Sequence, residues 1–193
     1  MKEPESIQRK TVIFLGDSFT EGYGLAAEHS FPSRIRARLA GREGWCIVNG
    51  GRSGDTVMDA YYRLDGLLKA HPRPDYLVIF LGANDIFRGV GVHFSYRYFG
   101  EIIDRARNVY PGIQIFVARI PSFSMEKSRP GDFESIFPRL ESEYKVVLLP
   151  FFLEGVLFRP ELCLPDGVHP NAEGMQKVAD NVWDFLFVPH LLG

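Results

Sequence analysis

Residues 11–18 read TVIFLGDS, a nearly all-apolar run that ends in a Gly-Asp-Ser turn. Comparable apolar runs recur along the chain, and the stretches between them carry apolar residues at helical spacing. We predict five strands, at residues 11–15, 45–48, 76–81, 113–120 and 146–149. Because strands that are apolar throughout are covered by helices on both faces, this pattern favours an α/β fold with a mostly parallel sheet.

The stretches between the strands predict amphipathic helices. Apolar residues fall on one face at Val57, Tyr61, Leu64 and Leu68, and a second apolar stripe runs over residues 175–186. Weaker patterns predict three more helices, at residues 31–39, 98–109 and 133–144. The predicted elements alternate strand and helix, which is the order that builds an α/β/α sandwich of three layers.

Length and composition are those of one globular domain. The chain has 193 residues, of which 46% are hydrophobic and 24% charged, close to the averages for soluble proteins. We therefore expect a single domain over residues 1–193, with residues 1–10 as a polar N-terminal extension. That extension lacks the apolar core of a secretory signal, and no run is long enough to span a membrane, so we expect a cytoplasmic protein.

Charge and cysteine content exclude further classes. The net charge is −2 and the Lys and Arg residues are scattered, so we expect no nucleic-acid partner. Cys46 and Cys163 have no zinc-like or CxxC spacing, and two buried thiols are favoured over a disulfide. Nothing in the pattern selects an oligomeric state.

Polar and glycine-rich motifs follow the first two predicted strands. Ligands of an open parallel sheet bind at the carboxyl ends of its strands. The first is Gly16-Asp17-Ser18-Phe19, in which a tight turn would expose Ser18 as a nucleophile; alternatively, Ser18 only caps a helix. The second, residues 49–56, reads NGGRSGDT, and its glycines allow backbone N–H groups to approach a ligand. By itself it is equally well an ordinary capped connection.

Two further motifs complete the set. Gly82-Ala83-Asn84-Asp85 would bring a side-chain amide to the same edge, where it could bind an oxyanion, although alone it is a typical turn. In the segment 166–171, DGVHPN, the three-residue spacing lets the Asp166 carboxylate reach His169 Nδ1 and leaves Nε2 as a base. The alternative is a loop histidine beside a helix cap. Together the four motifs supply a nucleophile, a base, an orienting carboxylate and oxyanion donors.

In their order along the chain, these four blocks resemble those of the SGNH (GDSL-type) hydrolase family. The resemblance implies a flavodoxin-like five-stranded parallel sheet. It also implies Ser18 as nucleophile, His169 and Asp166 as the rest of a triad, and an oxyanion hole made of the Ser18 and Gly54 N–H groups and the Asn84 side chain. Two positions outside the catalytic set depart from the family pattern, Phe19 in place of leucine and Ala83 in place of glycine.

Further stretches, such as SGDT at 53–56 and LPFF at 149–152, are similar to the bacterial arylesterase, thioesterase and lysophospholipase branch. This similarity implies a small-molecule acyl ester or thioester as substrate, with no cofactor and no metal. Asp17 and Asp55 flank the motifs, but no cluster with metal-ligand spacing accompanies them.

We place substrate selection in two long loops, residues 86–96 and 121–132. Their apolar side chains near the active edge would line an acyl channel: Phe87, Val92, Phe94, Phe123 and Met125. In a chain with 16 phenylalanines, any one of these residues is as readily explained as core filler.

Other functions fit the sequence less well. Residues 51–55 read GRSGD, which lacks the final glycine of the α/β-hydrolase nucleophile motif, and no glycine-rich stretch continues into the Gly-Lys-Ser/Thr of a P-loop. Two alternatives stay open: a carbohydrate O-acetylesterase built on the same blocks, and, less favoured, a non-catalytic ligand-binding protein on this scaffold.

Overall fold

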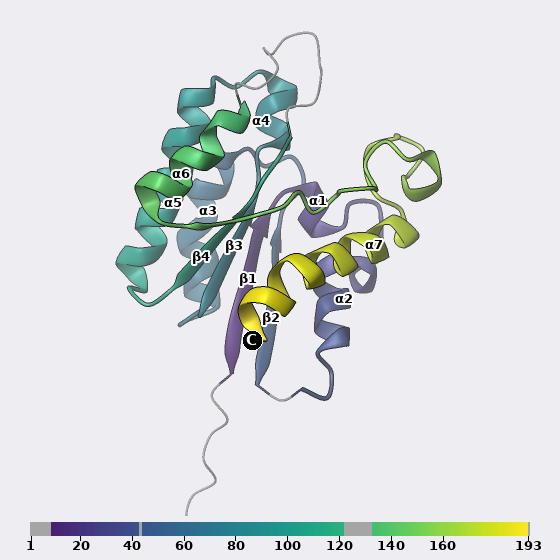
Figure 1. Cartoon of the computed structure of the whole chain (residues 1–193), viewed down its shortest axis with the longest axis horizontal. Helices are drawn as coiled ribbons and strands as arrows, with labels where there is room; N and C mark the ends of the chain where they lie inside the picture. The colour runs from purple at the N-terminus through teal and green to yellow at the C-terminus, as the bar shows by residue number, and fades with distance from the viewer. Residues whose placement is uncertain (1–8, 43, 122–132, 193) are drawn as a thin grey trace, which may run out of the picture.

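A five-stranded parallel sheet runs through the middle of the molecule (Figure 1). The computed structural model describes residues 9–42, 44–121 and 133–192. The strands lie in the order β2-β1-β3-β4-β5, the order of flavodoxin-like sheets. Their bounds are Lys10–Gly16 (β1), Trp45–Gly51 (β2), Tyr76–Phe80 (β3), Gln114–Ala118 (β4) and Val147–Leu149 (β5). All five predicted strands are present, and the predicted fold class is confirmed.

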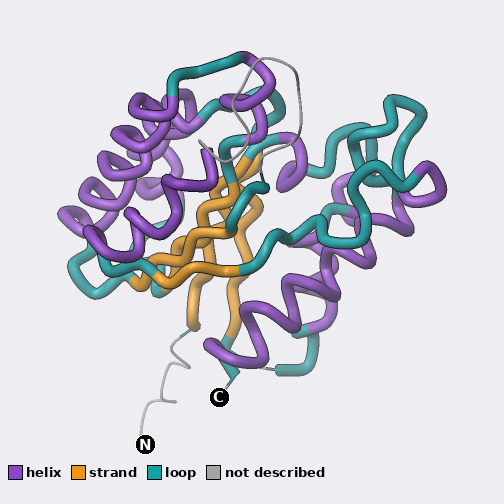
Figure 2. The backbone as a smooth tube through the Cα atoms, turned by 45° about the horizontal axis from the view of Figure 1, so that its top comes forward, coloured by secondary structure: helices purple, strands orange, loops and turns teal. Residues whose placement is uncertain are grey.

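Helices cover both faces of this sheet (Figures 1 and 2). One layer contains α3 (Val57–Ala70), α4 (Ala83–Arg88), α5 (Val92–Val109) and α6 (Ile136–Tyr144); the other contains α2 (Phe31–Arg38) and α7 (Ala172–Val182). The short α1 (Ser18–Glu21) lies at the carboxyl end of β1, and α7 continues as wider π-helical turns over Trp183–Leu191. Short 3₁₀ turns occupy Ala27–His29, Phe133–Ser135 and Pro160–Leu162.

Burial explains why these segments form the predicted elements. In β1, residues 12–15 are entirely buried, as expected for a central strand with a neighbour on each side and a helical layer over each face. In α3, the buried side chains recur at helical spacing, and the helix begins with a capping box between Thr56 and Asp59. The apolar stripe of α7 is buried in the same way.

The structure corrects one prediction. Residues 86–96 are not a long loop, because α4 continues through Arg88 and α5 begins at Val92, six residues before the predicted start. The turn between the helices is made by Gly89, whose φ of +66° ends α4, and by Val90 and Gly91. The first turn of α5 contains valine, histidine and an aromatic residue, which are weak helix formers, so local propensity hides it.

Among the residues that the structure describes, none of the helices is both long enough and apolar enough to span a bilayer. The second predicted loop, residues 121–132, lies almost wholly outside the described residues.

Candidate active site

Ser18 lies at the carboxyl end of β1, as the first residue of α1. Asp17 caps this helix by accepting the Phe19 N–H at 3.0 Å, and Gly22, at φ +88°, ends it one turn later. The turn packs very closely on the sheet: a Cβ added to Gly16 would lie 2.0 Å from Thr20 Oγ1. Only glycine permits this approach, which fixes Ser18 above the strand end.

Ser18, His169 and Asp166 form one hydrogen-bonded chain. His169 Nε2 lies 2.9 Å from Ser18 Oγ, and His169 Nδ1 lies 2.7 Å from Asp166 Oδ2. Asp166 Oδ1 also accepts the backbone N–H groups of Val168 and His169, at 2.9 Å each. With its proton on Nδ1, the imidazole donates to Asp166 and accepts from the serine hydroxyl. This arrangement can remove a proton from Ser18.

The surroundings of Asp166 favour its ionised form. Partial burial raises the pKa of this carboxyl, but the two backbone N–H groups and the imidazole outweigh that effect and hold the pKa below its ordinary value. Two aromatic rings contact the imidazole of His169: the Tyr23 ring centroid lies 4.5 Å from it and that of Phe19 lies 5.6 Å from it. The ring position is therefore fixed by a carboxylate at one edge and by contact with two aromatic rings.

The predicted oxyanion donors come from three segments. Gly54 lies in the loop between β2 and α3, where its φ of +85° belongs to the left-handed region that favours glycine. Asn84 is the second residue of α4, and its amide Nδ2 donates to the Asp55 carbonyl at 3.0 Å and approaches Asp17 Oδ2 at 3.4 Å. The structure thus brings Asn84 beside the residue that precedes Ser18, and Gly54 beside the carbonyl to which Asn84 binds.

Buried carboxylates surround this side of the site. Burial is the main cause that raises the pKa of Asp17 to about 7; the Phe19 N–H opposes it, and the Asp85 and Asp55 charges add to it. Burial likewise raises the pKa of Asp85, which accepts from the Ser95 hydroxyl and the Val57 N–H. Low dielectric and neighbouring negative charge both disfavour ionisation here.

Sequence reasoning did not identify Arg63 as part of the site. Its guanidinium forms an ion pair with Asp55 and donates to the carbonyls of Gly16 and Gly50, at 3.0 and 2.8 Å. It therefore joins the ends of β1 and β2 to the loop that holds Gly54. On the polar side of a predicted amphipathic helix, nothing distinguishes such an arginine from a solvated one.

The predicted substrate-binding residues have mixed outcomes. Phe87 and Phe94 are 39% and 51% exposed, at the end of α4 and the start of α5, whereas Val92 packs partly against the core. Phe123 and Met125 lie outside the described residues. The predicted channel is therefore represented by two surface rings and one core contact.

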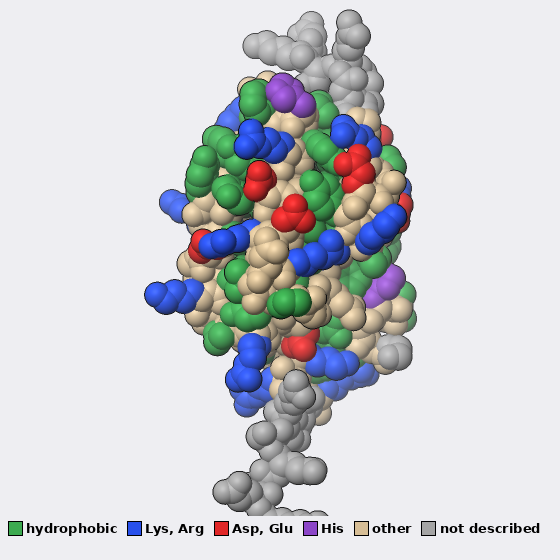
Figure 3. Space-filling model, turned by 90° about the vertical axis from the view of Figure 1, so that its left-hand side faces the viewer, with side chains coloured by type: hydrophobic (Ala, Val, Ile, Leu, Met, Phe, Trp, Pro, Cys, Tyr) green, Lys and Arg blue, Asp and Glu red, His purple; other side chains and the backbone are tan. Residues whose placement is uncertain are grey.

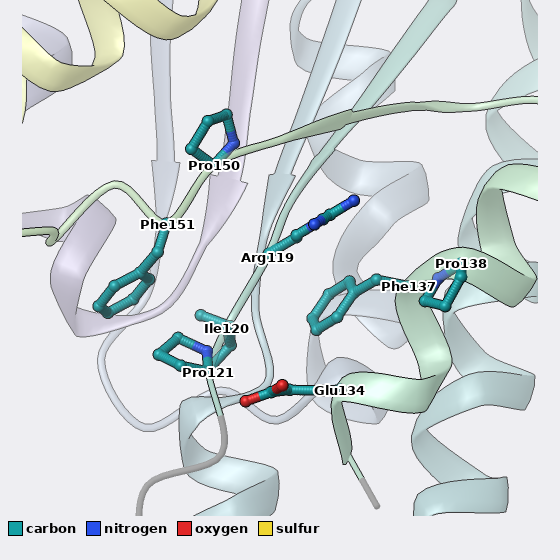
Figure 4. Close-up of a pocket in the computed structure, with 8 residues that line it drawn as sticks. All are labelled: Arg119, Ile120, Pro121, Glu134, Phe137, Pro138, Pro150 and Phe151. Atoms are coloured by element: carbon teal, nitrogen blue, oxygen red, sulfur yellow. The ribbon is translucent and has the colours of Figure 1, made fainter. Parts of the chain in front are cut away.

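A cleft of about 450 Å³ lies at the same edge of the sheet, beyond β4 and β5 (Figure 4). It is lined by Arg119, Ile120, Pro121, Glu134, Phe137, Pro138, Pro150 and Phe151. In Figure 4 the Phe137 ring points from α6 toward Ile120, and Phe151 extends from the segment that follows β5.

This cleft borders the oxyanion side of the site. A Cβ on Gly82, two residues before Asn84, would lie 3.8 Å from the cleft residue Ile120 and 2.5 Å from the ring of Phe133. A row of neighbouring aromatic rings also extends from the cleft to the base, His169. Neighbouring rings in this row, Phe151, Phe80 and Phe19, are 6.1 and 6.3 Å apart.

Across the described ranges 9–42, 44–121 and 133–192, no three His, Cys, Asp or Glu side chains are grouped so as to hold a metal ion. Cys46 and Cys163 are free thiols, and Cys163 is buried.

Known proteins resemble this chain in sequence and in fold. The model of the GDSL-like lipase/acylhydrolase family matches residues 14–177. An arylesterase of Vibrio mimicus is 34% identical over 181 residues, which cover 93% of this chain and 89% of the relative. The thioesterase 1/protease 1/lysophospholipase L1 of Escherichia coli K12 is 32% identical over 172 residues, which cover 88% of this chain and 80% of the relative.

Solved structures agree with these sequence matches. The psychrotrophic esterase EstA from a Pseudoalteromonas species, in a structure inhibited by monoethylphosphonate, superposes with a TM-score of 0.85 at 25% identity. The superposition covers 91% of this chain and 96% of the esterase.

Proposed function

The chain belongs to the GDSL-like lipase/acylhydrolase family and is accordingly a carboxylic ester hydrolase; on that premise we propose that it hydrolyses acyl esters and acyl thioesters through a Ser18-His169-Asp166 triad. The observation that carries the proposal is the continuous chain of two hydrogen bonds, 2.7 and 2.9 Å long, from Asp166 through His169 to Ser18 Oγ. A nucleophile, a base and an orienting carboxylate in this geometry are sufficient for acyl transfer.

In the proposed reaction, Ser18 Oγ attacks the acyl carbonyl while His169 Nε2 takes its proton. The ionised Asp166 stabilises the imidazolium and keeps its ring in place. His169 then protonates the leaving oxygen or sulfur, and the acyl group stays on Ser18. A water molecule activated by the same imidazole releases the acid and restores the serine.

The negative charge of the tetrahedral intermediate would be held by the N–H groups of Ser18 and Gly54 and by the Asn84 amide. Asn84 suits this role because its Nδ2 is held by a 3.0 Å bond to the Asp55 carbonyl and has only a long, 3.4 Å contact with Asp17. An amide nitrogen carries two hydrogens, so donor capacity is left for an oxyanion.

The 450 Å³ cleft beside Ile120 and Phe137 is our candidate for the acyl group. Both side chains are buried and apolar, and the cleft adjoins the strand end that leads to Asn84. Six of the eight residues that line the cleft are apolar, and only Arg119 and Glu134 are charged. A mostly apolar cleft of this size accommodates an alkyl chain, whereas sugar hydroxyls require more positioned polar groups. For that reason we favour acyl esters and thioesters over the acetylated sugars of the alternative function.

The test is one substrate panel. We expect wild-type kcat/KM to rise from acetyl to medium-chain aryl esters, to be measurable for acyl-CoA and lysophospholipid, and to be low for acetylated xylose. Replacement of Phe151 by Ala should penalise the longer chains by ~1–3 kcal/mol in transition-state binding, the usual scale for lost apolar contacts in a specificity pocket.

The control is Tyr62→Ala, which removes an aromatic ring that is 70% exposed on α3 and does not line that cleft. It should leave the chain-length profile unchanged. A strong preference for acetylated xylose that neither substitution alters would favour the carbohydrate O-acetylesterase instead. If Ser18 is not labelled by a fluorophosphonate, the non-catalytic alternative gains support.

A further inference from the structure

The proposed oxyanion donors sit on three separate segments. Ser18 is on α1, Gly54 is in the loop before α3, and Asn84 is on α4. An oxyanion hole works only if its donors all lie about 3 Å from one point. Side chains that join these segments would therefore set the geometry of the hole.

Glu21 joins the Gly54 loop to α1. It is the last residue of that helix, three positions after Ser18, and its Oε2 accepts the Ser53 N–H at 2.9 Å. The same oxygen accepts the Ser53 hydroxyl. One carboxylate thus holds both polar hydrogens of the residue that precedes Gly54.

Arg88 joins the same loop to α4. It is the last residue of α4, one turn beyond Asn84, and its Nη2 donates to the Gly54 carbonyl at 2.7 Å. The carboxylate of Asp59 is 3.9 Å from the Arg88 guanidinium, beyond hydrogen-bond distance, so the Gly54 carbonyl is the closer partner. The bond fixes the peptide on the carboxyl side of a glycine that already occupies the left-handed region.

The outer side of this loop faces open space. A polar cleft of about 440 Å³ borders Gly54 and is lined by Arg52, Ser53, Gly54, Asp55, Asp59, Tyr62, Arg63 and Arg88. Side chains packed in a core would hold a loop from that direction by contact alone. Here polar contacts supply the restraint: the Arg63–Asp55 ion pair and the Asn84 bond hold Asp55, and the bonds of Glu21 and Arg88 hold Ser53 and Gly54.

We propose that Glu21 and Arg88 are positioning residues that set the spacing of the oxyanion donors, one linking the Gly54 loop to the Ser18 helix and the other linking it to the Asn84 helix. This inference rests on the proposed function. Both side chains are exposed, so their bonds contribute little to the free energy of unfolding. Their effect is on position, where an error of 1 Å can cost ~10²-fold in rate.

The experiment compares Arg88→Met with Arg105→Met in the full chain. Arg105, on α5, makes two hydrogen bonds to Asp65 on α3, at 2.7 and 2.6 Å. Neither residue belongs to the α4 segment that carries Asn84 and Arg88. Figure 3 views the molecule from the side of α5 and shows acidic and basic side chains interspersed there. The control therefore removes an equally well-paired surface arginine.

We expect Arg88→Met to lower kcat about 5- to 20-fold, less than the loss of a whole oxyanion donor, with KM changed less than about twofold. Arg88→Lys, which keeps one donor, should recover part of this loss. Arg105→Met should stay within about twofold of wild type in both constants. All three variants should unfold within a few degrees of wild type.

Glu21→Met should resemble Arg88→Met, and its matched control is Glu101→Met, which breaks the exposed Arg97–Glu101 pair on α5. The decisive comparison uses the Asn84→Ala background. If Arg88 acts through the oxyanion hole, its substitution should cost less than about twofold there, because the hole is already impaired.

Three results would overturn the inference: wild-type kcat in Arg88→Met, a change in KM alone, or an undiminished kcat loss in the Asn84→Ala background. Failure of the proposed function has a different signature: the Ser18→Ala variant would keep the activity of the wild type. In an enzyme that depends on Ser18, each of these results bears on the positioning role alone.

Discussion

The base side and the oxyanion side of the site are built in opposite ways. Asp166 and His169 are three residues apart, in one turn of chain, and their side chains are 39% and 23% exposed. The oxyanion side draws Ser18, Gly54 and Asn84 from three segments and surrounds them with buried carboxylates. One side is local and solvated, whereas the other depends on how three elements pack.

The difference has an electrostatic counterpart. On the base side, backbone N–H groups and the imidazole lower the pKa of Asp166, so the carboxylate is ionised wherever the histidine can act as a base. On the oxyanion side, burial and two neighbouring carboxylates raise the pKa of Asp17 to about 7. The base side thus stabilises the Asp166 carboxylate, which orients the histidine. On the oxyanion side, the surroundings of Asp17 destabilise a carboxylate beside the nucleophile.

The largest expected effects lie in the triad, where the base side meets the Ser18 hydroxyl. Ser18→Ala should lower kcat by ~10⁴-fold or more and abolish fluorophosphonate labelling, because Ser18 supplies the attacking oxygen. His169→Ala should be nearly as damaging, and Asp166→Asn should retain more activity because the base survives in a poorly held orientation. Kinetics with an aryl ester and intact-mass spectrometry of the labelled protein measure both outcomes. Labelling of Ser18→Ala, or wild-type rates in His169→Ala, would rule out this triad.

The same contrast explains what the sequence could predict. The spacing of Asp166 and His169 allows the carboxylate to reach the imidazole within one turn, although by itself it left open a loop histidine beside a helix cap; in the structure the two side chains lie 2.7 Å apart. The five strands and the α3 and α7 helices follow from hydrophobic periodicity, which core burial enforces. Local information was sufficient for these parts.

The remaining parts depend on packing between distant segments. The link from Arg63 to the ends of β1 and β2 is of this kind, and so are the bonds from Arg88 to Gly54 and from Glu21 to Ser53. In the sequence these are single charged residues on helices, which usually face solvent. The start of α5 was hidden for a related reason, since a buried bond from Ser95 to Asp85 accompanies a helical turn of weak formers.

On the oxyanion side, Asn84→Ala should lower kcat by ~10²–10³, the usual scale for one donor, with a smaller effect on KM, because that bond forms chiefly in the transition state. Asn84→Asp is a useful companion, since it keeps the shape but places an acceptor where a donor is needed. Steady-state kinetics on one aryl ester are sufficient. An effect confined to KM would assign Asn84 to substrate binding instead.

Asp17→Asn should change stability in a pH-dependent way. The folded-state pKa is raised above its ordinary value of 3.8 to about 7, so ionisation of Asp17 destabilises the fold progressively as pH rises from about 4 to 7. Removing the charge should therefore stabilise the protein at pH 8 and have no effect near pH 4. A shift of this size corresponds to ~4 kcal/mol, and we expect about half, because the new amide would face that of Asn84.

Urea unfolding at a series of pH values measures this difference, and Asp65→Asn is the control, because Asp65 is exposed and its pKa is lowered by Arg105. That control should lose stability only slightly at high pH, because it removes an exposed ion pair. Equal stability of Asp17→Asn and wild type at pH 8 would show that the buried carboxyl carries no such cost.

The smallest expected effect tests whether the two sides act as separate parts. The Tyr23 ring lies 4.5 Å from the His169 imidazole at an angle of 41°, and it is half exposed. An aromatic face stabilises an adjacent cation by ~0.5–1 kcal/mol at exposed sites, so Tyr23→Leu should lower kcat about 2- to 5-fold as the imidazolium loses that support. Tyr23→Phe keeps the ring and should remain near wild type.

Combining Tyr23→Leu with Asn84→Ala tests whether the base side and the oxyanion side act independently. Tyr23 acts on the charge that forms on His169, and Asn84 acts on the charge that forms on the substrate oxygen. If packing leaves the two sides independent, their free-energy effects add and the double variant shows the product of the two losses in kcat. Arg88→Met with Asn84→Ala should fall short of such a product, because both act on one side. If the kcat loss of the Tyr23→Leu/Asn84→Ala double variant also fell short of the product by a similar factor, the base side and the oxyanion side would be coupled. That result would contradict the independence of the two sides.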